Sequence, residues 1–370
     1  MTEQGSIFDG FEHRGVRYAN RVAFSPLTRA RASANGVPDH LQATYYRQRA
    51  GAGLQIAEAT AVLPEGHGGI WTPGLYDQAQ VDGWRLTTDA VHAAGGKIYA
   101  QLWHAGRLSH SSFHPDGLPP ASPAAIAAQG QVHIAQGRVD YEVPRALRAS
   151  EIDTIVLAFE RAARNAMNAG FDGVEIHAAH GYLLDSFLRD AINDRTDDYG
   201  GSLENRARFL VAVLRRVVAA IGPDKVAVRL SPDTQAGGMR DSDPQATFNY
   251  VIDQMNALDI AWLDLVEGNN LVSRDIADGI DVAALVVRFK GAVILNHGYT
   301  LDMANAAIGS GAADMIAFGR PFIANPDLVE RFRHGYPLAE GSRSTWYGGG
   351  AEGYSDFPTY RSNPTETAGN

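Results

Sequence analysis

Eight short apolar runs, rich in Val, Ile and Leu, recur along this chain, and most are followed by a segment with helical periodicity. The runs are RVAFSPLTR, LQIAEAT, KIYAQLWHAGR, DGVEIHAAHG, VAVRLSP, AWLDLVEG, AVILNHG and MIAFGRP. Such runs are typical of parallel strands buried on both faces, and their alternation with helices is typical of βαβ units. Because no linker divides the 370 residues, the pattern predicts one closed (β/α)8 TIM barrel.

Three segments add detail to this barrel. In ASEIDTIVLAFERAARNAMNAG, Ser150 is expected to cap the helix start and Gly170 to end the helix. FEHRGVRYAN, with Gly15 in its turn, predicts an N-terminal hairpin that covers the barrel's N-terminal mouth. From Ser109 to Leu147 the strand–helix repeat is missing, which predicts a long loop excursion after the third strand. Long structured loops of this kind commonly form a wall or lid of a site.

Charge and composition narrow the class of partner. The formal net charge of -10 argues against a general affinity for nucleic acid or anionic membranes, although it permits a local basic pocket for one phosphate. The absence of cysteine excludes disulfides, thiolate metal sites and cysteine-bound iron–sulfur clusters. We find neither a secretion signal nor a run of about eighteen apolar residues. We therefore expect a cytoplasmic protein, a monomer or small homo-oligomer, that acts on a small molecule.

The ends of the eight runs carry an unusual set of residues, and chemistry in parallel barrels collects at the carboxyl ends of the strands. Gly298 and Gly319 follow the seventh and eighth runs, where barrels often bind phosphate, and Arg320 adds a fixed positive charge. Gln101 can both donate and accept, which suits the imide edge of a flavin. Arg229 can stabilise negative charge on a reduced flavin. These residues indicate a large planar cofactor with a phosphate.

At this point the chain resembles the old yellow enzyme family of flavin-dependent ene-reductases. The resemblance covers nearly the whole chain, through SPLTRARA, AQLWHAGR, VRLSP, IAFGRPFIANPDL and the GGGAEGYSDFP tail, and is most specific in HAAHGYLLDSFLRDAINDRTDDYGGSLENR. It implies one barrel over residues 1–360 that binds FMN non-covalently, takes hydride from NADPH or NADH, and reduces activated alkenes such as enones, enals, maleimides or nitroalkenes. Residues 361–370 are expected to form a disordered tail.

The resemblance also implies roles for individual residues. His177 and His180 hold the activating oxygen of the substrate, and Tyr182 donates the proton. Trp103 and Tyr354 correspond to walls of the substrate pocket. The implied flavin contacts are Pro26, Leu27, Thr28, Ala59, Gln101, Arg229, Gly298, Gly319 and Arg320.

Three positions differ among members of the family. Some members have cysteine where Thr28 stands, which does not affect the reaction. Some members have asparagine where His180 stands, and either residue is compatible with the reaction. In the loop EGHGGIWTPG the family often has a tyrosine, whereas this chain has Ile70 and Trp71. The resemblance therefore does not define the pocket wall that this loop forms, or the substrate preference.

Alternative interpretations of the histidines are structural packing, a metal site, or a flavin barrel that stores or senses without turnover. Zinc or iron would need further ligands, for which Glu175, Asp264 and Glu267 are candidates. A metal site leaves Gln101 and Arg229 unexplained, so we predict none. Storage alone does not require a tyrosine positioned beside two histidines, which favours an enzyme.

Overall fold

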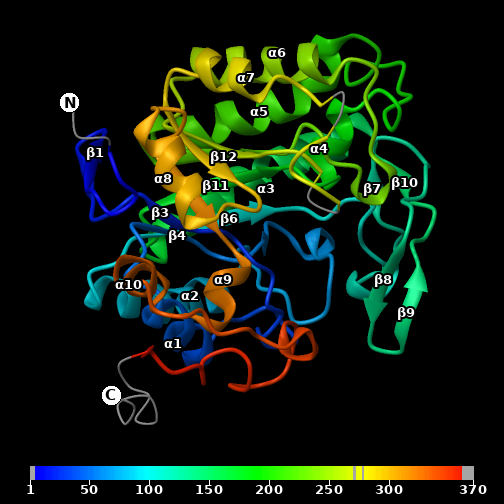
Figure 1. Cartoon of the computed structure of the whole chain (residues 1–370). Helices are drawn as coiled ribbons and strands as arrows, with labels where there is room; N and C mark the ends of the chain where they lie inside the picture. Colours follow the sequence, from blue (N-terminus) through cyan, green and yellow to red (C-terminus); the bar gives the residue numbers. More distant parts are fainter. Residues whose placement is uncertain (1–4, 270–271, 277–278, 361–370) are drawn as a thin grey trace, which may run out of the picture.

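The computed structural model describes residues 5–269, 272–276 and 279–360, and its centre is a closed ring of eight parallel strands (Figure 1). In ring order these are β11 (Gly173–Ala178), β12 (Val226–Leu230), β13 (Trp262–Val266), β14 (Ala292–Asn296), β15 (Met315–Phe318), β3 (Val22–Phe24), β4 (Leu54–Ile56) and β6 (Ile98–Trp103). The ring closes because β11 pairs with both β12 and β6. Each strand falls within one of the eight apolar runs, so the predicted (β/α)8 barrel is confirmed. The tail predicted over residues 361–370 lies outside the described residues.

Helices connect successive strands and surround the ring. They are α1 (His40–Gln48), α2 (Gln78–Ala93), α3 (Ala149–Asn168), α4 (Leu183–Leu188), α5 (Leu203–Ile221), α6 (Pro244–Ala257), α7 (Val282–Arg288), α8 (Leu301–Gly309), α9 (Arg320–Ala324) and α10 (Leu328–His334). Short 3-10 helices cover Pro64–Gly66, Ser111–Phe113, Pro223–Lys225, Ala236–Gly238 and Arg343–Thr345. Across the described ranges, no helix combines the length and apolar character needed to cross a membrane.

The start of α3 differs from the sequence expectation. The N-cap is Arg148, not Ser150, because the Glu151 carboxylate accepts a hydrogen bond from the Arg148 backbone N–H at 2.8 Å. This contact allows the helix to begin before the serine. Gly170 adopts φ +88° directly after the C-cap, as expected of the residue that ends a helix.

The N-terminal hairpin consists of β1 (Phe11–His13) and β2 (Val16–Tyr18), which pair antiparallel around a turn that contains Gly15. It lies at the left end of the barrel in Figure 1. The Tyr18 ring packs edge-on against Trp262 of β13, with 5.4 Å between ring centroids. The hairpin therefore covers the N-terminal mouth of the barrel, as predicted.

The excursion after β6 is also confirmed and lies at the opposite end (Figure 1). It contains β7 (Ala121–Ser122) and β10 (Arg145–Ala146), which pair with each other, and the hairpin β8 (Gln131–Ile134) and β9 (Gly137–Asp140). A short strand, β5 (Thr60–Ala61), pairs with the end of β6 on the same side.

Candidate active site

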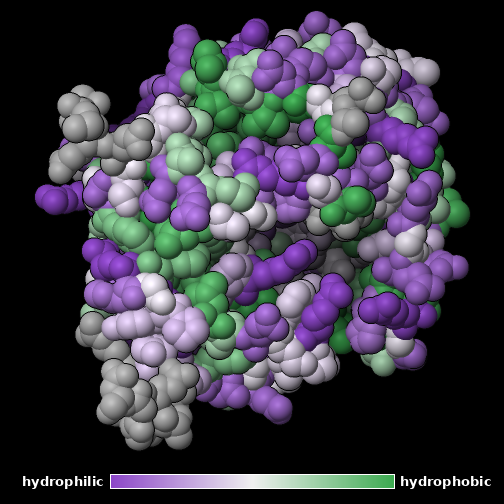
Figure 2. All heavy atoms as spheres, in the orientation of Figure 1, coloured by the Kyte–Doolittle hydropathy of each residue, from purple (hydrophilic) through white to green (hydrophobic). Residues whose placement is uncertain are grey.

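Two adjoining cavities open at the carboxyl ends of the strands. The larger has a volume of about 720 Å³ and the smaller about 480 Å³. Pro26, Leu27, His180 and Arg229 line both, so the two cavities share a wall. In Figure 2 the surface is hollowed near the centre of the face that Figure 1 shows, between the barrel and the β8–β9 hairpin.

Almost all of the residues singled out in the sequence line these cavities. The larger cavity is lined by Thr28, Ala59, Gln101, Trp103, His177, Tyr182 and the four shared residues, and the smaller also by Gly298, Gly319 and Arg320. The exception is Tyr354, which was expected at the wall. Its side chain is fully buried, stacked on Tyr45 at 3.9 Å between ring centroids. Tyr347, seven residues earlier, lines the larger cavity instead.

Three arginines contact the C-terminal segment that contains Tyr347 and Tyr354. Arg29 donates hydrogen bonds to the carbonyls of Trp346 and Gly353, each at 2.8 Å, and Arg31 donates to the carbonyl of Thr345. The guanidinium of Arg49 lies 3.6 Å from the centroid of the Tyr45 ring. The segment therefore has Tyr354 inside the arginine cluster and Tyr347 at the cavity.

The two histidines and the tyrosine come from one tight turn. His177 lies near the end of β11, and His180 and Gly181 follow it with φ of +58° and +82°. A side chain at Gly181 would come within 2.8 Å of the Ala236 carbonyl, so this turn requires glycine. Tyr182 is the N-cap of α4, and its ring centroid lies 4.9 Å from that of His177. All three side chains thus face one cavity.

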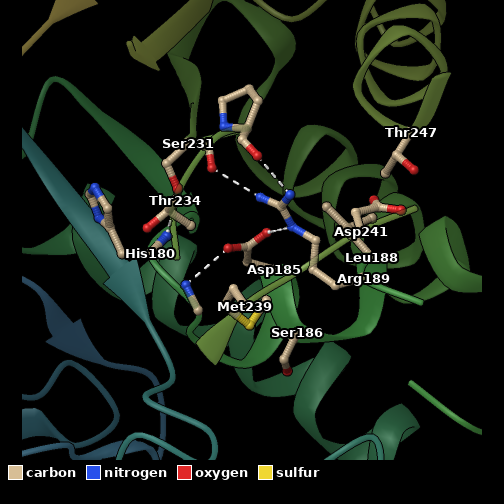
Figure 3. Close-up of polar contacts among 12 residues, drawn as sticks. His180, Asp185, Ser186, Leu188, Arg189, Ser231, Thr234, Met239, Asp241 and Thr247 are labelled. Atoms are coloured by element: carbon tan, nitrogen blue, oxygen red, sulfur yellow. Dashed lines mark hydrogen bonds and ion pairs between the residues drawn. The ribbon is translucent and has the colours of Figure 1, made fainter. Parts of the chain in front are cut away.

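A buried ion pair holds this turn in place (Figure 3). The Asp185 carboxylate accepts from the backbone N–H of Gly181 at 2.9 Å and from Nε of Arg189 at 2.8 Å. The guanidinium of Arg189 donates further to the carbonyls of Ser231 and Pro232, which follow β12. The Ser231 hydroxyl accepts from the backbone N–H of His180 at 2.7 Å. The network therefore ties the turn after β11 to the loop after β12.

Removing the cation from this network is expected to destabilise the protein strongly. Both side chains are almost fully buried, at 2% and 0% exposed, so Arg189→Met leaves the Asp185 charge without its partner. Breaking a buried pair in this way typically costs about 3–5 kcal/mol of unfolding free energy, measured by urea denaturation. Arg288→Met is the matched control, because the Arg288–Asp253 pair is exposed and its loss should change stability little. Equal effects of the two substitutions would contradict this interpretation.

Burial sets the protonation states in the turn. It lowers the pKa of His180 to about 3, with the nearby Arg229 adding to the effect, and lowers the pKa of His177 well below its usual value. Burial also raises the pKa of Tyr182 above that of a free phenol. At neutral pH both imidazoles are therefore neutral and the phenol is protonated. Each of the three side chains retains one N–H or O–H to donate.

Beneath the turn, the barrel interior carries a layer of polar side chains. Gln101 Nε2 donates to Glu175 at 2.7 Å, and Arg229 donates to Asp264 at 2.6 Å. Arg229 also donates to the hydroxyl of Ser25 at 3.3 Å. Ser25 directly follows β3 and was not among the predicted site residues. Within the described residues, no group of three or more His, Cys, Asp or Glu side chains is placed to hold a metal. Of the carboxylates considered for a metal, Glu175 contacts Gln101, Asp264 contacts Arg229, and Glu267 pairs with Arg274 at 2.8 Å.

The smaller cavity has features that suit a phosphate. His297 and Gly298 adopt φ of +98° and +70°, which turns the chain sharply after β14. Gly319 is the N-cap of α9, and Arg320 is the first residue of that helix. Backbone N–H groups in turns and a nearby guanidinium are the usual partners of a phosphate group.

Comparisons with known proteins agree with this geometry. The model of the NADH:flavin oxidoreductase / NADH oxidase family matches residues 6–339. The chain is 42% identical over 375 residues to 12-oxophytodienoate reductase 7 from Oryza sativa subsp. japonica, which covers 96% of this chain and 95% of the relative. An old yellow enzyme homologue from Zymomonas mobilis has the same fold, with a TM-score of 0.92, 45% identity, and coverage of 96% and 99% of the two chains.

The chain belongs to the old yellow enzyme family.

Two further similarities describe what its relatives do. A probable flavin mononucleotide-dependent alkene reductase from Leishmania infantum is 41% identical over 349 residues, which cover 93% of this chain and 94% of the relative. Morphinone reductase, solved in complex with tetrahydroNAD, superposes with a TM-score of 0.90 at 41% identity over 96% of this chain and 98% of its own. This member of the old yellow enzyme family is therefore a flavin-dependent oxidoreductase.

Proposed function

We propose that this protein is an FMN-dependent ene-reductase that uses NADPH or NADH to reduce the C=C bond of enones, enals, maleimides and nitroalkenes. The observation that carries the proposal is the convergence of His177, His180 and Tyr182 on one cavity that also contains flavin-type contacts. We propose further that residues 1–360 act as one FMN-binding unit, because strands from β3 to β15 contribute to the two cavities.

The residues of the cavities suit non-covalent FMN. Gly298, Gly319 and Arg320 offer partners for the phosphate, and Gln101 and Arg229 offer an acceptor and a cation for the polar edge of the ring. The remaining contacts that we propose are Pro26, Leu27, Thr28 and Ala59. Arg229 Nε is buried and has no partner among the described residues, as expected of a group that faces a ligand. When bound there, FMN would supply the chemistry of hydride transfer from the nicotinamide to the alkene.

The histidines bind and polarise the alkene. Their neutral imidazoles each donate a hydrogen bond to the activating oxygen, which gains negative charge as hydride reaches the β-carbon. His177 Nδ1 is buried without a partner among the described residues, which supports a role toward a ligand. The strained φ of His180 is held by Ser231 and by the Asp185–Arg189 pair, so the donor geometry exists before substrate binds.

The tyrosine supplies the proton. The phenol of Tyr182 stays protonated at neutral pH because burial raises its pKa, so it can donate to the α-carbon of the substrate. Trp103 packs edge-on against this ring, with 5.2 Å between centroids, and fixes its position at the wall. Tyr347 and Ile70 line the same cavity and are expected to contact the substrate.

Kinetics test the proposed cycle. The catalytic side chains converge on a single cavity, so nicotinamide and alkene should bind in turn over the same flavin face. We expect ping-pong kinetics, with parallel lines in double-reciprocal plots and competitive inhibition by each substrate at high concentration. A stopped-flow experiment that detects both substrates bound together would contradict the single shared pocket.

A further inference from the structure

Four neighbouring strands of the barrel each carry one buried polar side chain in two registered pairs, and Arg229 is in register with His177, two residues beyond Glu175. Glu175 of β11 pairs in register with Gln101 of β6, and Arg229 of β12 pairs with Asp264 of β13. The exposed fractions are 0% for Glu175 and Asp264, 2% for Gln101 and 5% for Arg229. Gln101 and Arg229 line the larger cavity, whereas the two carboxyl groups lie behind them. We call these four residues the polar layer.

The hydrogen bonds of the polar layer use only half of its carboxyl oxygens. Glu175 Oε1 accepts from Gln101, and Asp264 Oδ2 accepts from Arg229. Glu175 Oε2 and Asp264 Oδ1 are fully buried and receive no donor from the described residues. The two carboxyl groups are close enough for the charge of Asp264 to raise the pKa of Glu175. Buried oxygens of this kind are nearly always satisfied, and a proton on one of the two carboxyl groups would supply a donor.

A single proton on the two carboxyl groups would remove the excess negative charge and give the unpartnered oxygens a hydrogen bond. Two ionised carboxylates beside one guanidinium would leave a net negative charge in the dry barrel interior, which is costly. A proton on Glu175 removes that charge and gives an O–H···O bond to Asp264. Burial and the neighbouring Asp264 carboxylate raise the pKa of Glu175 well above its usual value, in agreement with this assignment.

We propose that Glu175 and Asp264 share one proton and act as positioning residues for the flavin, with their joint single negative charge offsetting Arg229. This inference rests on the proposed function, since it assigns the pair a role toward FMN. Glu175 fixes the amide of Gln101, so that its oxygen is free to accept from the cavity side. The pair also keeps the polar layer electrically neutral, which limits how far Arg229 stabilises a reduced, negatively charged flavin.

The test is a double-mutant cycle on the midpoint potential of the bound flavin. Glu175→Gln keeps the ionised Asp264. In Asp264→Asn, Glu175 can lose its proton, and the net charge is again unchanged. Each single variant should therefore shift the potential little. The double variant leaves Arg229 without a counter-charge and should favour reduced over oxidised flavin at least tenfold, which is about 30 mV for a two-electron couple. Asp253→Asn, which removes an exposed carboxylate of α6, should leave the potential unchanged.

The possible results distinguish a shared proton from two independent charges. Single shifts that add up to the shift of the double variant would show two independent charges and overturn the shared proton. The infrared spectrum gives a second measurement on the chain itself. It should show the carbonyl stretch of a protonated carboxyl group above pH 7, which Glu175→Gln should remove, while Glu58→Gln identifies any contribution from Glu58, whose pKa burial raises to about 7. Absence of the Glu175 stretch in the parent protein would overturn the inference even if FMN is bound. Failure of the parent to bind FMN would instead contradict the proposed function.

Discussion

Tyr182→Phe is expected to slow reoxidation of the flavin by an enone by about 100- to 10,000-fold, the usual contribution of a positioned general acid. The ring and its contacts with Trp103 and His177 are retained, so FMN binding and reduction by the nicotinamide should stay near normal. Only the phenolic hydroxyl is lost, and with it the proton that is donated to the substrate. Rapid mixing of reduced enzyme with the enone measures this step in isolation from flavin reduction.

The choice of alkene provides the control for this substitution. The carbanion from an enone is poorly stabilised, whereas a nitronate can survive until solvent protonates it, so a nitroalkene should be affected less. Protonation by Tyr182 from the face opposite the flavin implies net anti addition, which deuterium labelling can determine. If the variant reduces enones at the parental rate, the proton comes from elsewhere and the tyrosine is only a wall of the pocket.

His177→Ala and His180→Ala are each expected to lower alkene turnover by about 100- to 1,000-fold, the usual cost of losing one donor to a developing oxyanion. Both should also weaken the binding of a phenol, which presents its oxygen to the same donors, while FMN stays bound. The measurements are single-turnover reoxidation and phenol titration of the oxidised enzyme.

An asparagine at position 180 distinguishes the loss of a hydrogen-bond donor from the loss of side-chain packing. His180→Asn retains an N–H donor on the same backbone turn and should recover much of the activity that His180→Ala loses. The low pKa of His180 adds a second check. Because this imidazole titrates near pH 3, its removal should not move the pH profile between pH 6 and 9. Unchanged phenol affinity in both alanine variants would exclude the histidines from the pocket.

The barrel and most of the site could be predicted from sequence for a simple reason. Parallel strands covered on both faces are predominantly apolar, so polar side chains near their carboxyl ends indicate where a site lies. Gln101, His177 and Arg229 could therefore be placed at one end of the barrel without knowledge of their contacts. The structure then brings them to a common cavity.

The parts of the site that could not be predicted depend on contacts between segments that are distant in the sequence. The C-terminal segment has no periodicity, and Arg29 and Arg31 decide that Tyr347 rather than Tyr354 lines the cavity. The i, i+4 spacing of Asp185 and Arg189 permits an ion pair, but only the fold supplies the Ser231 and Pro232 carbonyls that complete it. Sequence spacing carries no signal for such partners.

One anaerobic titration tests the proposed function most directly. The purified protein should be yellow, with FMN released on denaturation in equimolar amount to the chain. NADPH or NADH should bleach the flavin absorbance, and an equimolar enone or maleimide should restore it and be recovered with its C=C bond reduced. A colourless protein that takes up no FMN would contradict the proposed cofactor. A flavin that is bleached but never restored by any activated alkene would contradict the proposed reaction.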